Sequence, residues 1–250
     1  MAGRADLSWL TARPIAHRGL HGLAAGVIEN CPRAFAAAIA GGYAIECDVQ
    51  PTADGDAIVF HDSTLDRLTT ASGRVDARTV ADLRATAFKA TDDRMGTLSD
   101  LFDQVAGRVP LVVEIKSEFD GRLDLTRRVA ALAAGYSGPL ALMSFDPGPI
   151  AWLKDNAPAL VRGIVAESHY AGAHWAKLPE AVRRDLSSLA HAARTEPDFL
   201  SWRVADLPNA ATTAFRAAGK PVICWTVRTD DERVIGAKHA DQVTFEGYLA

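Results

Sequence analysis

Residues 44–62 read AIECDVQPTADGDAIVFHD, and this stretch decides the fold more than any other part of the chain. Two short runs rich in apolar and β-branched residues, Ala44 to Val49 and Ala57 to Phe60, flank the dipeptide Asp54-Gly55. Because Asp-Gly between two such runs is typical of a hairpin turn, we predict that the second run returns antiparallel to the first.

The same hairpin predicts a cluster of ionisable groups. Glu46 and Asp48 are two residues apart, so the period of a strand places both carboxylates on one face. Asp48 and His61 are equidistant from the Asp54-Gly55 turn, and we therefore expect them to oppose each other. Two carboxylates and an imidazole then converge at one end of the hairpin.

Alternation of strands and helices continues along the whole chain. We predict seven further strands, at Pro14 to Ala16, Leu111 to Ile115, Leu140 to Met143, Val161 to Val165, Asp198 to Trp202, Val222 to Val227 and Gln242 to Phe245. Alanine-rich amphipathic segments predict helices at Pro32 to Ala40, Leu98 to Val105, Leu123 to Ala134, Pro147 to Asn156, Pro179 to Ala190 and Asn209 to Ala218. With the hairpin's return strand set aside, eight parallel strands remain, which favours a (β/α)8 TIM barrel. A doubly wound open sheet stays as the alternative, because repeated βα units alone do not prove closure.

The chain has 250 residues, 48% of them hydrophobic, and a net charge of −4. This length suits one barrel domain over residues 1–250, with an insertion at about residues 62–97 on the barrel mouth. The acidic balance argues against a nucleic-acid partner. Because Met1 to Pro14 lacks a continuous apolar segment, we expect a cytoplasmic protein without stable membrane insertion. The sequence does not indicate an oligomeric state.

Further ionisable residues end neighbouring strands. Glu114 and Lys116 repeat the spacing of two, and His17 and Arg18 end the first strand. In a barrel these strand ends share the C-terminal rim, where active sites of this fold lie. Three carboxylates (Glu46, Asp48 and Glu114) without a thiolate partner suit a hard divalent cation, Ca²⁺ or Mg²⁺.

Five ordered motifs together carry a family resemblance: His17-Arg18-Gly19, Glu29-Asn30, Glu46-x-Asp48, Thr52-x-Asp54-Gly55 leading to His61-Asp62, and Glu114-x-Lys116. In this order the chain resembles the glycerophosphodiester phosphodiesterase family, a group of TIM barrels in the phosphatidylinositol phospholipase C-like superfamily. The match extends weakly to Ser144-Phe145 and to Trp225.

The resemblance implies metal-dependent hydrolysis of a small-molecule glycerophosphodiester to glycerol 3-phosphate and an alcohol. It implies metal ligands at Glu46, Asp48 and Glu114 and acid/base catalysis by His17 and His61. The nucleophile is either the substrate's own glycerol hydroxyl, which gives a cyclic phosphate, or water. Arg18 and Lys116 are expected to bind the phosphate, and Phe145 and Trp225 the rest of the substrate.

Some assignments stay open at this point. Glu29 and Asn30 either support the site from behind its ligands or cap the helix that begins at Pro32. The family's last strand often ends in Thr-Asp, where this chain has Phe245-Glu246, a position that we interpret as peripheral to the site. The usual proline before Glu29 is Ile28, which we expect to be neutral.

Two other functions compete with this one. A related barrel with lysophospholipase D or sphingomyelinase D-like activity would use the same histidines and metal, but it would need an apolar rim to meet a membrane. The predicted insertion is mainly polar, which argues mildly against this activity. The second alternative is a catalytically silent barrel that binds a phosphodiester, and the presence of both histidines and all three carboxylates speaks against it.

Overall fold

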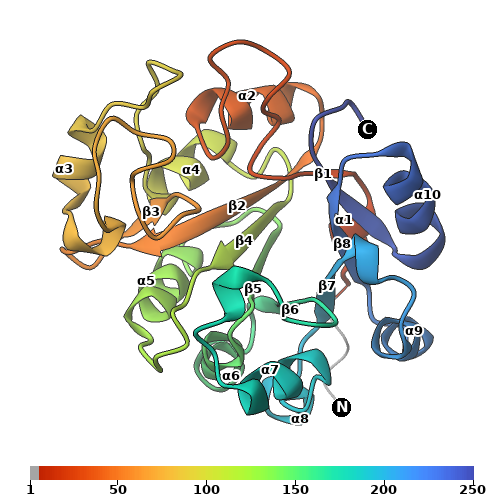
Figure 1. Ribbon diagram of the computed structural model, residues 1–250. Coiled ribbons are helices and arrows are strands. Elements are labelled where there is room, and N and C mark those ends of the chain that lie inside the picture. The colour runs from red at the N-terminus through yellow and green to blue at the C-terminus, as the bar shows by residue number, and fades with distance from the viewer. Residues whose placement is uncertain (1–5) are drawn as a thin grey trace.

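The computed structural model describes residues 6–250, and its centre is a closed barrel of eight parallel strands (Figure 1). Around the barrel the strands follow the order β1-β2-β4-β5-β6-β7-β8-β9. Closure comes from β1, because Ile15 lies in register with Ala44 of β2 on one side and with Thr244 of β9 on the other. This confirms the predicted (β/α)8 barrel and excludes the open sheet. The parallel strands are β1 (Ile15–Ala16), β2 (Ala44–Pro51), β4 (Leu111–Ile115), β5 (Leu140–Ser144), β6 (Val161–Ala166), β7 (Phe199–Arg203), β8 (Val222–Val227) and β9 (Gln242–Phe245).

Helices surround this barrel and bury its outer face. The α-helices are α1 (Ser8–Thr11), α2 (Pro32–Ala40), α3 (Val80–Ala85), α4 (Leu98–Val105), α5 (Asp124–Ala133), α6 (Pro147–Asn156), α7 (Glu180–Ser187), α8 (Ala192–Thr195), α9 (Ala210–Ala217) and α10 (Asp230–His239). Short 3-10 helices are η1 (Val75–Ala77), η2 (Ala173–Trp175) and η3 (Val204–Asp206). Within residues 6–250, every helix is too short or too polar to cross a bilayer.

The interior of the barrel is a packed core and not a channel. Inward side chains from seven strands meet there, and Leu10 of α1 packs with them. The ring of Phe199 lies so close to the backbone of Gly163 that a Cβ added to Gly163 would stand 2.3 Å from it. Glycine is therefore required at that point of β6.

The hairpin has a different register from the predicted one. Strand β3 (Ala57–Val59) runs antiparallel to β2, with Gln50 opposite Ile58. Thr52 donates its backbone N–H to the Asp56 carbonyl, so three residues form the loop and Gly55 takes a positive φ of 81°. Asp48 consequently pairs with Phe60, and the prediction that His61 lies directly opposite Asp48 is wrong by one residue.

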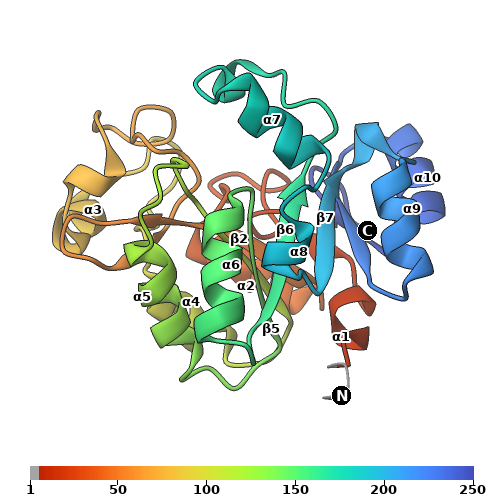
Figure 2. The same ribbon diagram turned by 90° about the horizontal axis from the view of Figure 1, so that it is seen from below.

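Two segments extend from the barrel. Residues 62–97 lie beyond β3 with α3 on their outer side (Figure 1), around an apolar cluster that includes Leu65, Leu83 and Met95. The connection after β6 carries η2 and α7, which lies on the side of the barrel opposite α1 (Figure 2). Buried side chains of this connection, among them Trp175, pack against Phe119 and Phe145.

Candidate active site

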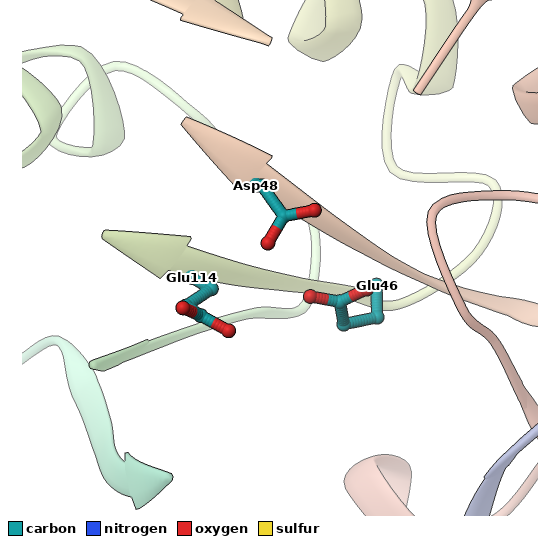
Figure 3. A group of neighbouring side chains, drawn as sticks. All are labelled: Glu46, Asp48 and Glu114. Atoms are coloured by element: carbon teal, nitrogen blue, oxygen red, sulfur yellow. The ribbon is translucent and has the colours of Figure 1, made fainter. Parts of the chain in front are cut away.

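Three carboxylates gather at the C-terminal ends of β2 and β4. Asp48 and Glu114 occupy the same register of the two neighbouring strands, and Glu46 stands two residues before Asp48 on the same face (Figure 3). One oxygen from each carboxylate lies within 4.8 Å of the others. The three residues are only 1–8% exposed. The predicted convergence of these side chains is therefore what the structure contains.

Cations compensate this cluster unevenly. The Lys116 ammonium lies 2.7 Å from Asp48 Oδ1 and 2.6 Å from Glu114 Oε1, and Arg18 Nε lies 3.4 Å from Asp48 Oδ2. Burial opposes ionisation of Asp48, but the charges of Lys116, His61 and Arg18 outweigh it and hold its pKa well below the usual range. Asp48 is therefore the carboxylate whose ionised form the neighbouring cations stabilise.

Glu46 is in the opposite situation. Burial, followed by repulsion from Asp48 and Glu114, raises the pKa of Glu46 well above its ordinary value. Its Oε2 accepts one hydrogen bond, from the backbone N–H of Arg18 at 3.0 Å. An all-oxygen donor set with one carboxylate left uncompensated fits a hard divalent cation, which would remove this repulsion. The residues that could hold such an ion are Glu46, Asp48 and Glu114.

This asymmetry predicts opposite stability effects in metal-free protein. Glu46→Gln removes a repelled charge and keeps the acceptor for Arg18, so we expect its melting temperature to rise by roughly 2–4 °C, equivalent to about 1 kcal/mol. Asp48→Asn leaves Lys116 and Arg18 without their shared anion, and we expect a fall of roughly 6–12 °C, equivalent to about 3 kcal/mol. Thermal unfolding in chelator at neutral pH measures both changes.

The sign follows from the pKa values. A raised pKa of Glu46 in the folded state costs stability as pH rises, whereas the depressed pKa of Asp48 contributes stability that is lost as pH falls below 4.

Glu46→Gln and Asp48→Asn should both weaken metal binding by at least about tenfold, because loss of even a residue that only supports a ligand lowers metal affinity 10- to 100-fold. Calorimetry on protein stripped of metal measures this affinity. Wild-type metal affinity in both variants would refute the ligand assignment.

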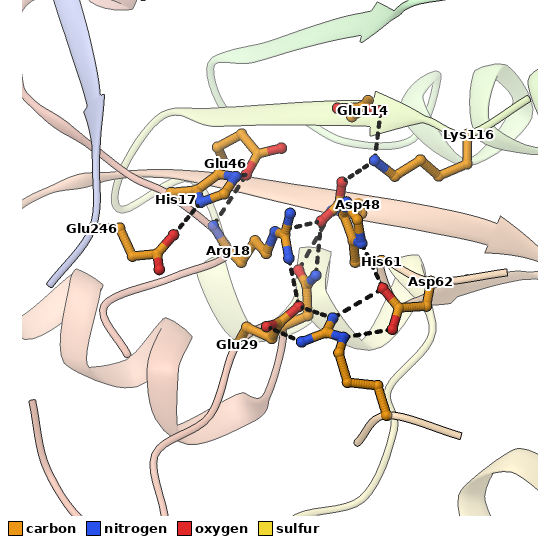
Figure 4. Close-up of polar contacts among 12 residues, drawn as sticks. His17, Arg18, Glu29, Glu46, Asp48, His61, Asp62, Glu114, Lys116 and Glu246 are labelled. Carbon is orange, nitrogen blue, oxygen red and sulfur yellow. Dashed lines mark hydrogen bonds and ion pairs between the residues drawn. The ribbon is translucent and has the colours of Figure 1, made fainter. Parts of the chain in front are cut away.

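His17 directly follows β1, and its imidazole is fixed by a residue that follows β9, the strand that pairs with β1 to close the barrel. Its Nδ1 lies 2.7 Å from Glu246 Oε2 (Figure 4). Glu246 in turn accepts a hydrogen bond from Arg228 at 2.8 Å. Burial opposes ionisation of Glu246, but these two bonds lower its pKa to about 2. A carboxylate can only accept here, so Nδ1 of His17 carries the proton and Nε2 is left for chemistry.

His17 is itself buried, and burial lowers its pKa to about 4 despite the hydrogen bond to Glu246, which raises it. The imidazole is therefore neutral near pH 7. The interpretation of Glu246 as peripheral is wrong, because its longer side chain reaches the imidazole from the end of β9.

His61, just after β3, is held by the same kind of arrangement. Its Nδ1 lies 2.7 Å from Asp62 Oδ1, and Arg67 donates to both oxygens of Asp62 at 2.6 and 2.9 Å. Each histidine is thus fixed by a carboxylate that an arginine fixes in turn. No sequence pattern indicates Arg67 or Arg228, and Asp62 was predicted only as part of the motif that contains His61.

Glu29 and Asn30 support the cluster and do not cap a helix. The residue that precedes α2 in the capping position is Cys31, which makes no side-chain cap bond. Asn30 Nδ2 donates to Asp48 Oδ2 at 2.9 Å, and Glu29 accepts from Arg18 at 2.6 Å and from Arg67 at 2.7 Å. The open choice between cap and support is decided in favour of support.

The turn after β1 has the backbone conformation that brings the Arg18 N–H to Glu46. Gly19 has a φ of 80°, and a Cβ added there would lie 2.9 Å from Ala34 of α2. Arg18 also has a positive φ, of 55°. The turn therefore requires glycine at position 19, and it directs the Arg18 backbone N–H at Glu46.

These groups surround a cavity of about 300 Å³. Both histidines, the three carboxylates, Arg18 and Lys116 line it, and Phe145 and Trp225 form an apolar wall with ring centroids 5.4 Å apart. The structure thus brings all of the predicted ligand, histidine, phosphate-binding and aromatic positions to one place. Such an arrangement can position an anion beside two imidazoles and a divalent cation.

The family model described as "Glycerophosphoryl diester phosphodiesterase family" matches residues 17–244. The chain belongs to this family. A curated relative is 37% identical to this chain over 111 residues. It is named "Glycerophosphodiester phosphodiesterase" and comes from Caldanaerobacter subterraneus subsp. tengcongensis. That match covers 41% of this chain and 44% of the relative, so it spans less than half of the relative's length.

Solved structures share the barrel of this family member. A phosphodiesterase of Oleispira antarctica, in complex with the product sn-glycerol-3-phosphate, has a TM-score of 0.78 at 20% identity, over 96% of this chain and 95% of its own. A glycerophosphodiester phosphodiesterase of Agrobacterium tumefaciens has a TM-score of 0.68 at 23% identity, over 92% and 94%. At these identities the likeness establishes the fold.

Proposed function

We propose that this chain hydrolyses glycerophosphodiesters to glycerol 3-phosphate and an alcohol, using a divalent cation, Ca²⁺ or Mg²⁺, and two histidines. The observation that carries the proposal is that His17 and His61, each held by its own carboxylate, line the same cavity as the acidic cluster. Membership of the family supports it, as does the glycerol phosphate product in the similar Oleispira antarctica structure.

In this proposal Glu46, Asp48 and Glu114 hold the metal. A divalent cation, when bound there, compensates the carboxylates and polarises a phosphoryl oxygen. Asn30 keeps Asp48 oriented by donating to the oxygen that Lys116 does not contact. Such support around a ligand typically decides the geometry of the site.

The histidines move protons. Cleavage of the P–O bond to the alcohol requires one group to accept the proton of the attacking hydroxyl or water and another to protonate the departing oxygen. Both imidazoles have their Nδ1 occupied by a carboxylate, so each works at Nε2. Analysis of the products distinguishes the two nucleophiles. Attack by the glycerol hydroxyl passes through a cyclic phosphate, and attack by water does not.

Arg18 and Lys116 are the proposed phosphate contacts. Both are already paired with carboxylates, but an ammonium has three donors and Lys116 uses two of them. A donor remains for a non-bridging oxygen, where charge grows in the transition state. Arg18 and Lys116 thus contact both the proposed metal ligands and the phosphate of the substrate.

Release of glycerol 3-phosphate tests the proposal. We expect metal-loaded protein to release it from glycerophosphocholine, glycerophosphoethanolamine and glycerophosphoglycerol, and to cleave lysophosphatidylcholine poorly. Among the described residues, the exposed large apolar side chains are Leu23, Val234 and Leu249, too few for an extended apolar rim that meets a membrane. Efficient choline release from lysophosphatidylcholine alone would favour the lysophospholipase D alternative, and binding without cleavage would favour the silent barrel.

A further inference from the structure

A second and larger cavity opens directly beside the catalytic one. Its volume is about 1210 Å³. Six residues line both cavities: His61, Glu114, Lys116, Phe145, Arg203 and Trp225. A diester whose phosphate lies in the catalytic cavity therefore has space for one of its two alcohol portions in the second cavity.

The two cavities differ in charge. The catalytic cavity is lined by four carboxylates and four arginine or lysine side chains, whereas the second is lined by nine carboxylates and four arginine or lysine side chains. Of those four cations, Lys116 and Arg203 also line the catalytic cavity. The other two, Arg74 and Arg122, are paired with Asp76 and Asp120. Three further carboxylates, Asp56, Asp62 and Asp124, pair with arginines that do not line the cavity, so its excess of negative charge comes from the carboxylates without an ion pair.

Two of its carboxylates are buried without an ion pair among the described residues. Glu167 is 5% exposed and accepts a hydrogen bond from Trp175 Nε1 at 3.0 Å. Asp146 is 8% exposed and accepts from Ser117 Oγ at 2.5 Å and from the Gly148 N–H at 2.8 Å, where it caps α6. Asp146 has a structural reason to be there. Glu167 holds a tryptophan against the cavity and keeps its charge uncompensated.

Aromatic rings complete the cavity wall. Phe145 stands between two tryptophans, with its centroid 5.4 Å from Trp225 at an interplanar angle of 86° and 5.1 Å from Trp175 at 60°. Phe119 adds a fourth ring, 6.0 Å from Trp175. Rings at steep angles to one another, beside an unpaired carboxylate, are the surroundings that attract an alkylammonium ion through cation–π and Coulomb forces.

We propose that the second cavity is a subsite for a substrate alcohol that carries an ammonium group, of the choline or ethanolamine kind, recognised by Phe145, Trp175, Trp225 and Glu167. This inference rests on the proposed hydrolysis. The carboxylates without an ion pair favour a cationic alcohol over a neutral one and repel an anionic alcohol in the same place. The connection after β6 contributes Trp175 and Glu167, and it is therefore the segment that selects the substrate.

The test compares kcat/KM for glycerophosphocholine with kcat/KM for glycerophosphoglycerol, whose second alcohol is uncharged. We expect a ratio above one in the wild type and a ratio about tenfold lower in Glu167→Gln, which keeps an acceptor for Trp175 but loses the charge. Phe145→Leu should lower the ratio as well. Glu180→Gln makes the same change on the exposed face of α7, where Glu180 pairs with Arg184, and should keep the wild-type ratio.

Calorimetry with choline chloride separates this inference from the proposed hydrolysis. Choline should bind the wild type and Glu180→Gln, and bind Glu167→Gln about tenfold more weakly. If diesters are cleaved but choline does not bind and no variant changes the ratio, the subsite is refuted and the hydrolysis stands. If choline binds in this pattern while no diester is cleaved, the proposed hydrolysis fails and the ammonium site stands.

Discussion

His17→Ala and His61→Ala are each expected to lower turnover of a glycerophosphodiester by roughly 10²- to 10⁴-fold, about 3 to 5 kcal/mol of transition-state stabilisation. The reason is that each imidazole is held by a carboxylate with its Nε2 available at the cavity, so each is prepared for one proton transfer. Steady-state glycerol 3-phosphate release measures the loss. Calorimetric metal binding should survive in both variants, since neither histidine belongs to the proposed ligand set.

His239→Ala is the matched control, because His239 ends α10 and lines neither cavity. Its turnover should equal that of the wild type. Removing both catalytic histidines should cost much less than the product of the single losses, because groups that act as a unit are not additive. Near-normal turnover by either single variant would contradict the two-histidine mechanism.

A substrate with a good leaving group assigns the two roles. A nitrophenyl phosphodiester needs little protonation of its departing oxygen, so it should restore turnover only to the variant that lacks the acid. Rescue of one variant and not the other identifies acid and base, and equal rescue of both would argue against separate roles.

Removal of divalent metal is expected to abolish turnover entirely. Without a cation, Glu46 lies buried beside two other carboxylates, and the negative charge of this cluster opposes the entry of an anionic phosphodiester. Dialysis against chelator, followed by elemental analysis and the release assay, tests this directly. Adding back Ca²⁺ and Mg²⁺ separately identifies the ion that restores activity.

Thermal unfolding tests the metal site without relying on turnover. An ion that binds the native protein alone should raise the melting temperature with its concentration, and this rise should be smaller in Glu46→Gln and Asp48→Asn. Full turnover by protein shown to be free of metal would overturn the metal-dependent mechanism. Inactive chelated protein that no ion stabilises would instead point to loss of fold.

Much of the site could be predicted from short-range periodicity. The spacing of two in Glu46-x-Asp48 and in Glu114-x-Lys116 determines which side chains share a face, and adjacent parallel strands bring the two pairs together. Strand and helix positions were predictable for the same reason. The hairpin register was not, because an Asp-Gly turn is compatible with loops of two or three residues, and one residue decides whether Phe60 or His61 faces Asp48.

The contact that holds His17 depends on long-range geometry. Glu246 lies 229 positions from His17, and the two meet because β9 pairs with β1 in the register Ala16 to Phe245. Barrel closure was itself a prediction, so this neighbour could have been inferred from it. Arg67 and Arg228 reach their carboxylates from loops, for which no periodicity exists. Helix α10 was missed because Gly236 is its sole buried residue, although the capping box of Thr229 and Glu232 marks its start.

The two contacts of Arg67 have a consequence for exchanging parts between barrels. This arginine belongs to the segment beyond β3, and it donates to Asp62 beside His61 and to Glu29, which in turn holds Arg18. The outer segment is therefore attached both to His61, the proposed proton-transfer group, and to Arg18, the proposed phosphate-binding group. A graft that replaces residues 62–97 with a loop of another length inherits a misaligned His61 unless it restores a guanidinium at this junction, however well the barrel beneath it folds.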